Sequence, residues 1–139
     1  MNIRGTLEQV ISNGYERRLV VRSGGRLVCC ALLQHDEYLE PNQESRHFRV
    51  GSKISLKVAL TMAEVAGHGL KDVTGFYQPI AESPHAVVTG DVVGADSTDS
   101  CVLALGEGEA LSITFERDTA LARGVRAHIT GEFSVISLA

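Results

Sequence analysis

The stretch "RRLVVRSGGRLVCCALL" (residues 17–33) constrains the fold more than any other part of the chain. Its centre, Gly24-Gly25, separates two apolar runs, and both glycines accept the positive φ angles of a two-residue hairpin loop. Directly opposed residues, such as Val21 and Val28, would then share a sheet face. The stretch therefore predicts a β-hairpin with one buried face. That face carries Leu19, Val21, Val28, Cys30 and Leu32.

The stretch "SCVLALGEGEALSITFE" (residues 100–116) repeats this pattern in the second half of the chain. With Glu107-Gly108 as the loop, a second hairpin would form. A constant shift of 83 residues, from Leu19 to Val102, carries the first apolar face onto the second. The expected second face consists of Val102, Ala104, Leu111, Ile113 and Phe115.

The segments around the two hairpins also resemble each other. Residues 3–10 ("IRGTLEQV") parallel residues 88–95, and residues 50–56 ("VGSKISL") parallel residues 123–129. We interpret this as an internal duplication of a four-strand unit, although short β-rich segments also match one another by chance.

The chain is expected to be all-β. Glycine is frequent (14) and proline rare (3), and residues 53–62 alternate apolar and polar side chains as a half-buried strand does. We expect a first unit at 1–62, a connector at 63–85 with a helical turn near 63–66, and a second unit at 86–139. The two units would form either one barrel with a pseudo-two-fold axis or two tandem small barrels.

The second unit resembles the small-barrel pattern of OB-fold proteins and related translation-factor barrels. The resemblance rests on Gly124, just before the last strand, and Gly131, within it. It implies a barrel fold and no particular activity, because such barrels host many unrelated functions.

The composition of the chain argues against several classes of function. A net charge of −4, with seven aromatic residues and no Trp, argues against a general nucleic-acid binder, which needs a basic face and stacking side chains. Three cysteines do not make a disulfide framework. No apolar run reaches the ~20 residues of a membrane span, and the first ten residues do not resemble a signal peptide. We expect a cytoplasmic protein that does not engage a membrane.

The adjacent pair Cys29-Cys30 is best interpreted as part of a strand. Neighbouring strand residues point to opposite faces, so the two thiols cannot easily bind one metal ion. Cys30 is expected in the core. Cys29 would lie near Arg18 and Arg22 on the mixed face, where an exposed thiol would have a lowered pKa.

An insertion, "QHDEYLEPNQESRHF" (residues 34–48), distinguishes the first unit from the second. His35, Asp36, Glu37 and His47 could bind a divalent metal ion if the insertion folded back on itself. Their spacing matches no established ligand pattern, and a solvated polar loop is the favoured interpretation.

Four arginines, Arg17, Arg18, Arg22 and Arg26, lie on the first hairpin. They could form a phosphate-facing patch for a nucleotide or single-stranded nucleic acid, since guanidinium groups clamp phosphates. The acidic net charge weakens this alternative.

No catalytic set emerges from the sequence, and no cofactor is expected. We therefore predict a non-enzymatic binding or assembly module that engages a protein partner or itself. Exposed strand edges at the ends of each unit would favour a homo-oligomer.

Overall fold

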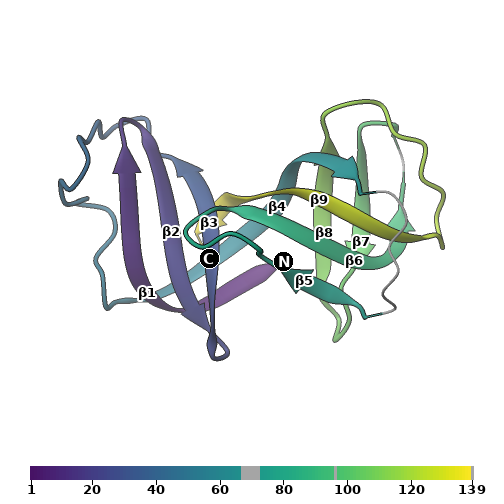
Figure 1. Ribbon diagram of the computed structural model, residues 1–139, viewed down its shortest axis with the longest axis horizontal. Helices are drawn as coiled ribbons and strands as arrows, with labels where there is room; N and C mark the ends of the chain where they lie inside the picture. The colour runs from purple at the N-terminus through teal and green to yellow at the C-terminus, as the bar shows by residue number, and fades with distance from the viewer. Residues whose placement is uncertain (67–72, 96, 139) are drawn as a thin grey trace.

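The computed structural model describes residues 1–66, 73–95 and 97–138. Over these residues the chain forms nine β-strands in one sheet and no helix, which confirms the all-β prediction (Figure 1). No helix of the described residues is long and apolar enough to cross a membrane. The strands are β1 (Asn2–Asn13), β2 (Glu16–Ser23), β3 (Arg26–Leu33), β4 (Lys53–Val65), β5 (Gly75–Tyr77), β6 (His85–Gly94), β7 (Ser100–Ala104), β8 (Ala110–Phe115) and β9 (Arg126–Leu138).

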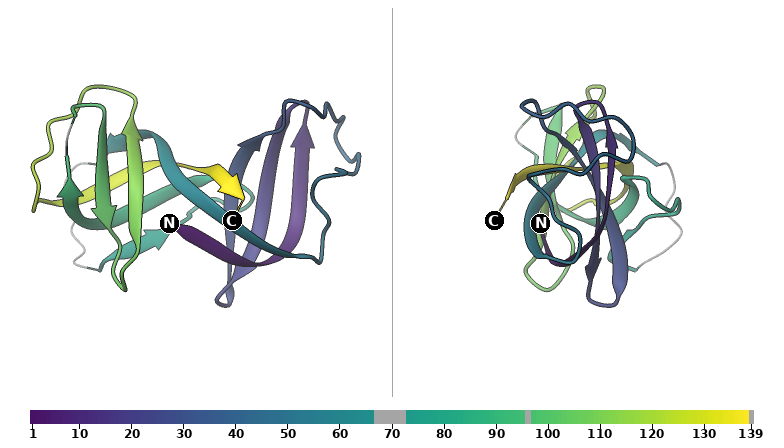
Figure 2. Two further views of the ribbon diagram at one scale, coloured as in Figure 1. Left: turned by 180° about the vertical axis from the view of Figure 1, so that it is seen from behind. Right: turned by 90° about the vertical axis from the view of Figure 1, so that its left-hand side faces the viewer.

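Eight of the strands close on themselves like a ring, and the β4–β9 pairing crosses that ring. The crossing divides the molecule into two lobes joined by β4 and β9, as the front and back views show (Figures 1 and 2). The first lobe closes through β1, β2, β3, β9 and β4, and the second through β6, β7, β8, β4 and β9. β4, from the first half of the chain, therefore also pairs in the second lobe, and β9, from the second half, also pairs in the first lobe.

The register of the two shared strands is symmetric. β4 and β9 both have 13 residues, and β9 begins 73 residues after β4, from Lys53 to Arg126. Leu60 lies opposite Phe133, also 73 residues away, so this pair is its own equivalent. Applying the 73-residue shift to both members of a pair gives another observed pair. Leu56↔Leu138 becomes Val65↔Ile129, and Lys57↔Ser137 becomes Glu64↔Thr130.

Two glycines occupy matching places at the lobe corners. A Cβ atom on Gly5 of β1 would lie 1.9 Å from the carbonyl oxygen of Arg22. A Cβ atom on Gly90 of β6 would lie 2.0 Å from the carbonyl oxygen of Ala104. Only glycine allows the backbones to approach this closely, so both lobes depend on the same residue type at the same corner.

The first hairpin forms as the sequence predicts. Val21 lies opposite Val28 and Leu19 opposite Cys30 across the two-residue loop. Cys30 is completely buried, as expected for a core thiol. The alternation of the two strands and the two glycines therefore suffices to set this register.

The predicted register of the second hairpin is wrong by one residue. Leu103 lies opposite Leu111, because the loop spans residues 105–109 instead of the two residues Glu107-Gly108. A slip of one residue turns every side chain of a strand to the other face. The buried residues of β7 are therefore Cys101 and Leu103, and not Val102 and Ala104.

The predicted helical turn at 63–66 is also wrong, because β4 continues to Val65 alongside β9. A β-bulge at this end of β4 interrupts the alternation. Met62 has a φ of 51° and is 58% exposed, whereas Ala63 is buried. Met62 therefore leaves the apolar face on which the alternation of residues 53–62 placed it.

Candidate functional site

Arg17 of β2 is the largest fully buried side chain of the molecule's described part. Its guanidinium donates to the carbonyl oxygens of Gly14, at 2.8 Å, and Glu16, at 2.9 Å. It also donates to the carbonyl oxygen of Glu37 and lies 3.3 Å from the Oε1 atom of that residue. A buried guanidinium is costly unless it is paired, so this contact ties the insertion to the first hairpin.

Glu37, near the start of the insertion, receives contacts from two residues near its end. The Ser45 hydroxyl donates to Oε1 at 2.7 Å, and the backbone N–H of Arg46 donates to Oε2 at 2.9 Å. This N–H lowers the pKa of the Glu37 carboxyl group, and Ser45 and Arg17 lower it further against the opposing effect of burial. The carboxylate is thus held ionised as the centre of a fixed loop.

The insertion and the β1–β2 turn each present one exposed tyrosine at the end of the first lobe. Tyr15 from the β1–β2 turn and Tyr38 from the insertion meet edge to face, with ring centroids 5.2 Å apart. The two side chains remain 48% and 59% exposed. Backbone hydrogen bonds between Gly14 and Leu39 hold the two segments together beneath the rings. We call Tyr15, Tyr38 and the surrounding insertion the tip; it forms the outer end of the lobe (Figure 2).

The other three arginines of the predicted phosphate patch do not converge. Arg18 donates to the carbonyl oxygen of Glu82 at 2.5 Å, and Arg22 pairs with Glu8 at 2.6 Å. The Cζ atom of Arg26 lies 3.8 Å from the centroid of the Phe76 ring, and the Arg26 guanidinium donates to the carbonyl oxygen of Phe76 at 3.1 Å. Arg18 and Arg26 therefore hold the segment around β5 against the first hairpin.

Gln78 completes this attachment. Its side-chain amide donates to the carbonyl oxygen of Cys29 at 2.7 Å and accepts from the Cys29 N–H at 2.8 Å. Cys29 is consequently buried, and burial raises the pKa of its thiol to about 11, although Arg18 acts in the opposite direction. The expectation of a lowered pKa applied to an exposed thiol, and this thiol is not exposed.

Two of the predicted metal ligands of the insertion, Asp36 and His47, lie together, and the other two are engaged elsewhere or exposed. His47 Nε2 lies 3.1 Å from Asp36 Oδ2, and Glu37 is engaged by Arg17 and Arg46. His35 is exposed. Among the residues that the structure describes, no group of three or more His, Cys, Asp or Glu side chains could hold a metal ion.

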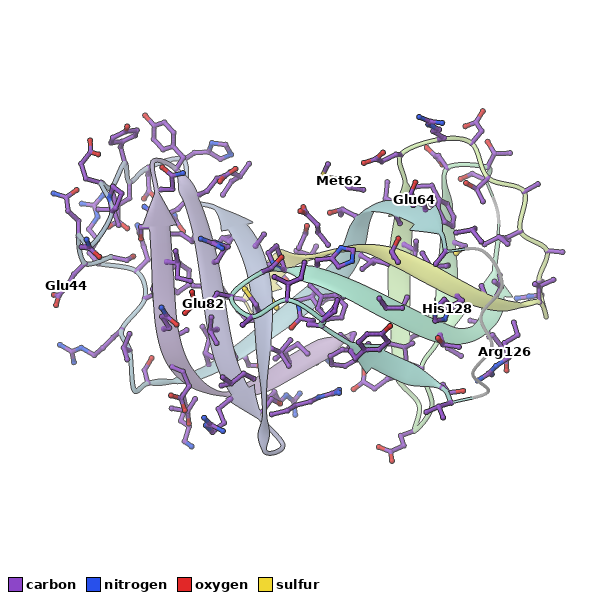
Figure 3. All side chains as sticks on the ribbon, in the orientation of Figure 1. Glu44, Met62, Glu64, Glu82, Arg126 and His128 are labelled. Carbon is purple, nitrogen blue, oxygen red and sulfur yellow. The ribbon has the colours of Figure 1, made fainter. Side chains whose placement is uncertain are left out.

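A cavity that the sequence analysis did not anticipate opens between the lobes, where β3 and β9 diverge. It has a volume of about 700 Å³. Met62, which projects into the notch between the lobes, is one of its residues (Figure 3). We call this cavity the groove. Its exposed apolar residues are Leu33, Met62 and Ile136, and Ile11, Leu32 and Val135 line it as well.

A second cavity of about 650 Å³ lies beside β5 on the second lobe. Thr89 Oγ1 and His128 Nδ1 form a 2.7 Å hydrogen bond at its wall, and Phe76 and Arg26 also line it.

The described residues thus form an all-β chain with a ring-like sheet, two exposed tyrosines at the tip, and a groove that both apolar and polar residues line. Comparisons with protein-family models, with curated proteins and with solved structures find no match to this chain. Functional inference therefore depends on the geometry alone.

Proposed function

We propose that the chain is a non-enzymatic binding module that engages a protein partner through the tip of its first lobe. One observation carries the proposal: a fully buried Arg17 attaches the insertion to the first hairpin, and exposed Tyr38 of the insertion packs there against exposed Tyr15 of the β1–β2 turn. Rigid, exposed tyrosines supply large contact areas at little entropic cost, and tyrosine is enriched at interface hot spots.

The buried ion pair supports this interpretation. Replacing such a pair by apolar residues is often neutral or stabilising, so stability alone is a weak reason to keep Arg17 and Glu37. Precise placement of the loop above them is a better reason. Binding residues are commonly presented on loops that a rigid scaffold positions.

We propose further that the lobes are small barrels that arose by duplication of a four-strand unit, with units at 1–62 and 86–139 and a connector at 63–85. The symmetric register of β4 and β9 and the matched Gly5 and Gly90 support this. Self-association is the second form of the proposal, since the tip could meet a second copy. Nucleotide binding by Arg17, Arg18, Arg22 and Arg26 and metal binding in the insertion have weaker support, because most of these side chains are engaged by protein groups.

The test is quantitative co-purification from the native cell type, with tagged wild-type protein and two variants. The double variant Tyr15→Ser/Tyr38→Ser removes the exposed rings, and Tyr77→Ser, at a similarly exposed tyrosine on β5, is the matched control. We expect specific partners to be retained by the wild type and by the control and to be lost with the double variant. Light scattering on the same samples identifies self-association. A partner set that the double variant leaves unchanged would contradict the proposal.

A further inference from the structure

The two lobes close their sheets at equivalent seams, and the described pairing is longer in the second lobe than in the first. In the second lobe, β4 and β8 pair in parallel through Leu60↔Ile113 and Ala63↔Phe115, and the Glu116 N–H donates to the Ala63 carbonyl oxygen at 3.1 Å. In the first lobe, β3 and β9 pair in parallel through Ala31↔Ser134 alone. The seam of the first lobe therefore has one bridge fewer than that of the second, and we call it the open seam.

The residues at the two seams also differ. The 73-residue shift between β4 and β9 places Ile136 at the position of Ala63. The 83-residue shift from Cys30 to Ile113 places Leu33 at the position of Glu116. Ala63 is 1% exposed, whereas Ile136 and Leu33 are both 55% exposed. The first lobe thus has the large Ile136 where the second has the small Ala63. It also has the apolar Leu33 where the second has the charged Glu116.

The open seam also presents an edge of β3. Cys29 turns its N–H and C=O outward to Gln78, and Ala31 bridges to Ser134 at the same edge. Backbone groups alternate in direction along a strand, so the N–H and C=O of Leu33 point to this edge as well. No bridge from Leu33 to β9 is present in the described ladder. The groove thus offers backbone hydrogen-bonding groups beside exposed apolar side chains.

We propose that the groove is a docking site for an extended segment of a protein partner with apolar residues at alternate positions. The segment would lie between β3 and β9, pair with the edge at Leu33, and bury its apolar side chains against Ile136 and Met62. The edge at Leu33 argues for this occupant, because its backbone groups have no bridge to β9 in the described ladder and lie beside exposed apolar side chains. Strand addition at a sheet edge combines main-chain hydrogen bonds with pockets for alternate side chains. The inference goes beyond the proposed function, since it depends on the seam and not on the tip.

The experiment is selection of displayed random dodecapeptides on the immobilised full chain, followed by fluorescence-anisotropy titration of the enriched peptides. We expect enriched peptides to alternate apolar and other residues. We expect the variant Leu33→Ser/Ile136→Ser to weaken their binding at least about tenfold. The matched control is Val93→Ser/Val125→Ser, which removes two exposed apolar side chains on the second lobe and should leave binding unchanged. Bound peptide should also slow amide exchange at Leu33.

The outcomes separate this inference from the proposed function. Binding that the tip variant Tyr15→Ser/Tyr38→Ser leaves intact, but that the groove variant abolishes, supports the groove as an independent site. Failure to enrich any peptide, or affinities insensitive to the groove variant, overturns the inference and leaves the tip proposal standing. A dimer in light scattering that dissociates only in the groove variant would show that a second copy is the occupant, which also overturns it.

Discussion

The two lobes share one framework and differ in what is added to it. Both have a glycine at the corner where the first strand of the lobe meets the second, both bury one face of a hairpin, and both use the symmetric β4–β9 pair. Only the first lobe has the insertion held by Arg17, and only the first lobe has an open seam. The corner glycines, the hairpins and the β4–β9 pair build the sheet in both lobes. The insertion and the open seam occur in the first lobe, and formation of the sheet does not require them. Function is best sought in the insertion and the open seam.

The largest effect is expected where the lobes share their core. Phe133 is completely buried opposite Leu60 and packs edge-on against Phe76, with ring centroids 5.0 Å apart. Phe133→Ala should lower the free energy of unfolding by about 3–5 kcal/mol, because it removes a buried ring and leaves a cavity. Both lobes should unfold in one transition, since β4 and β9 belong to each. Val125→Ala, at an exposed site, should change stability by less than about 0.5 kcal/mol. Chemical denaturation followed by circular dichroism measures both values, and two separate transitions would break the comparison.

The matched glycines should respond alike. Gly5→Ala and Gly90→Ala each place a methyl group against a backbone carbonyl oxygen, so each should cost about 1–3 kcal/mol of stability. Gly94→Ala is the control, because its Cβ would lie 3.6 Å from the Val102 side chain, an ordinary contact. The measurement is again chemical denaturation. A large cost at only one of the two glycines would argue against an equivalent role.

The insertion should detach when its buried cation is removed. Arg17→Met leaves the Glu37 carboxylate without its buried partner, and the insertion should open more often. Trypsin cleavage after Arg46 or Arg49 should then become roughly tenfold faster, since proteolysis follows the population of the open form. Arg117→Met, at an exposed arginine of the second lobe, should leave this rate unchanged. Unchanged cleavage in Arg17→Met would show that other contacts hold the insertion.

Acid should weaken the same attachment. The folded-state pKa of Glu37 is lowered from its usual value of 4.5, so its contribution to stability is complete above that value and is lost as the pH falls through the lowered pKa. Wild-type protein should therefore be more stable than Glu37→Gln near pH 7, and the difference should shrink below pH 4.5. Thermal unfolding at a series of pH values measures this. A difference that does not depend on pH would exclude ionised Glu37 as its source.

Much of the framework could be predicted from the sequence, because alternation and glycine turns act locally. The first hairpin register follows from Gly24-Gly25, and the burial of Cys30 follows from that register. The second register was not predictable from the same rule. A loop with three successive positive φ angles, at Gly106, Glu107 and Gly108, has the same glycine signal as a two-residue turn.

The candidate site was less accessible to sequence reasoning. The burial of Arg17 depends on an insertion that folds over it from 20 residues away, and no local pattern marks it. The groove includes Met62, which a bulge turns outward, and Ile136, which lies in β9 at the position that Ala63 occupies in β4. The second signal was available in the sequence, because the 73-residue shift that aligns residues 50–56 with residues 123–129 places Ile136 at the position of Ala63.

The smallest effect tests the open seam directly. Ile136→Ala gives the first lobe the residue type that the second lobe has at the equivalent position, Ala63. Because Ile136 is 55% exposed, the change in unfolding free energy should be within about 0.5 kcal/mol. The seam should nevertheless close: with the large side chain removed, β3 can continue beside β9 as β8 does beside β4.

Amide exchange at Leu33 is the measurement. Closure should slow exchange there, as Leu33 gains the counterpart of the hydrogen bond from Glu116 to Ala63. Ser137→Ala, one residue further along β9, provides a control that leaves Ile136 in place. If Leu33 exchanges as fast in Ile136→Ala as in wild-type protein, then the side chain at this position does not hold the seam open, and the divergence of β3 from β9 must come from the insertion that follows Leu33.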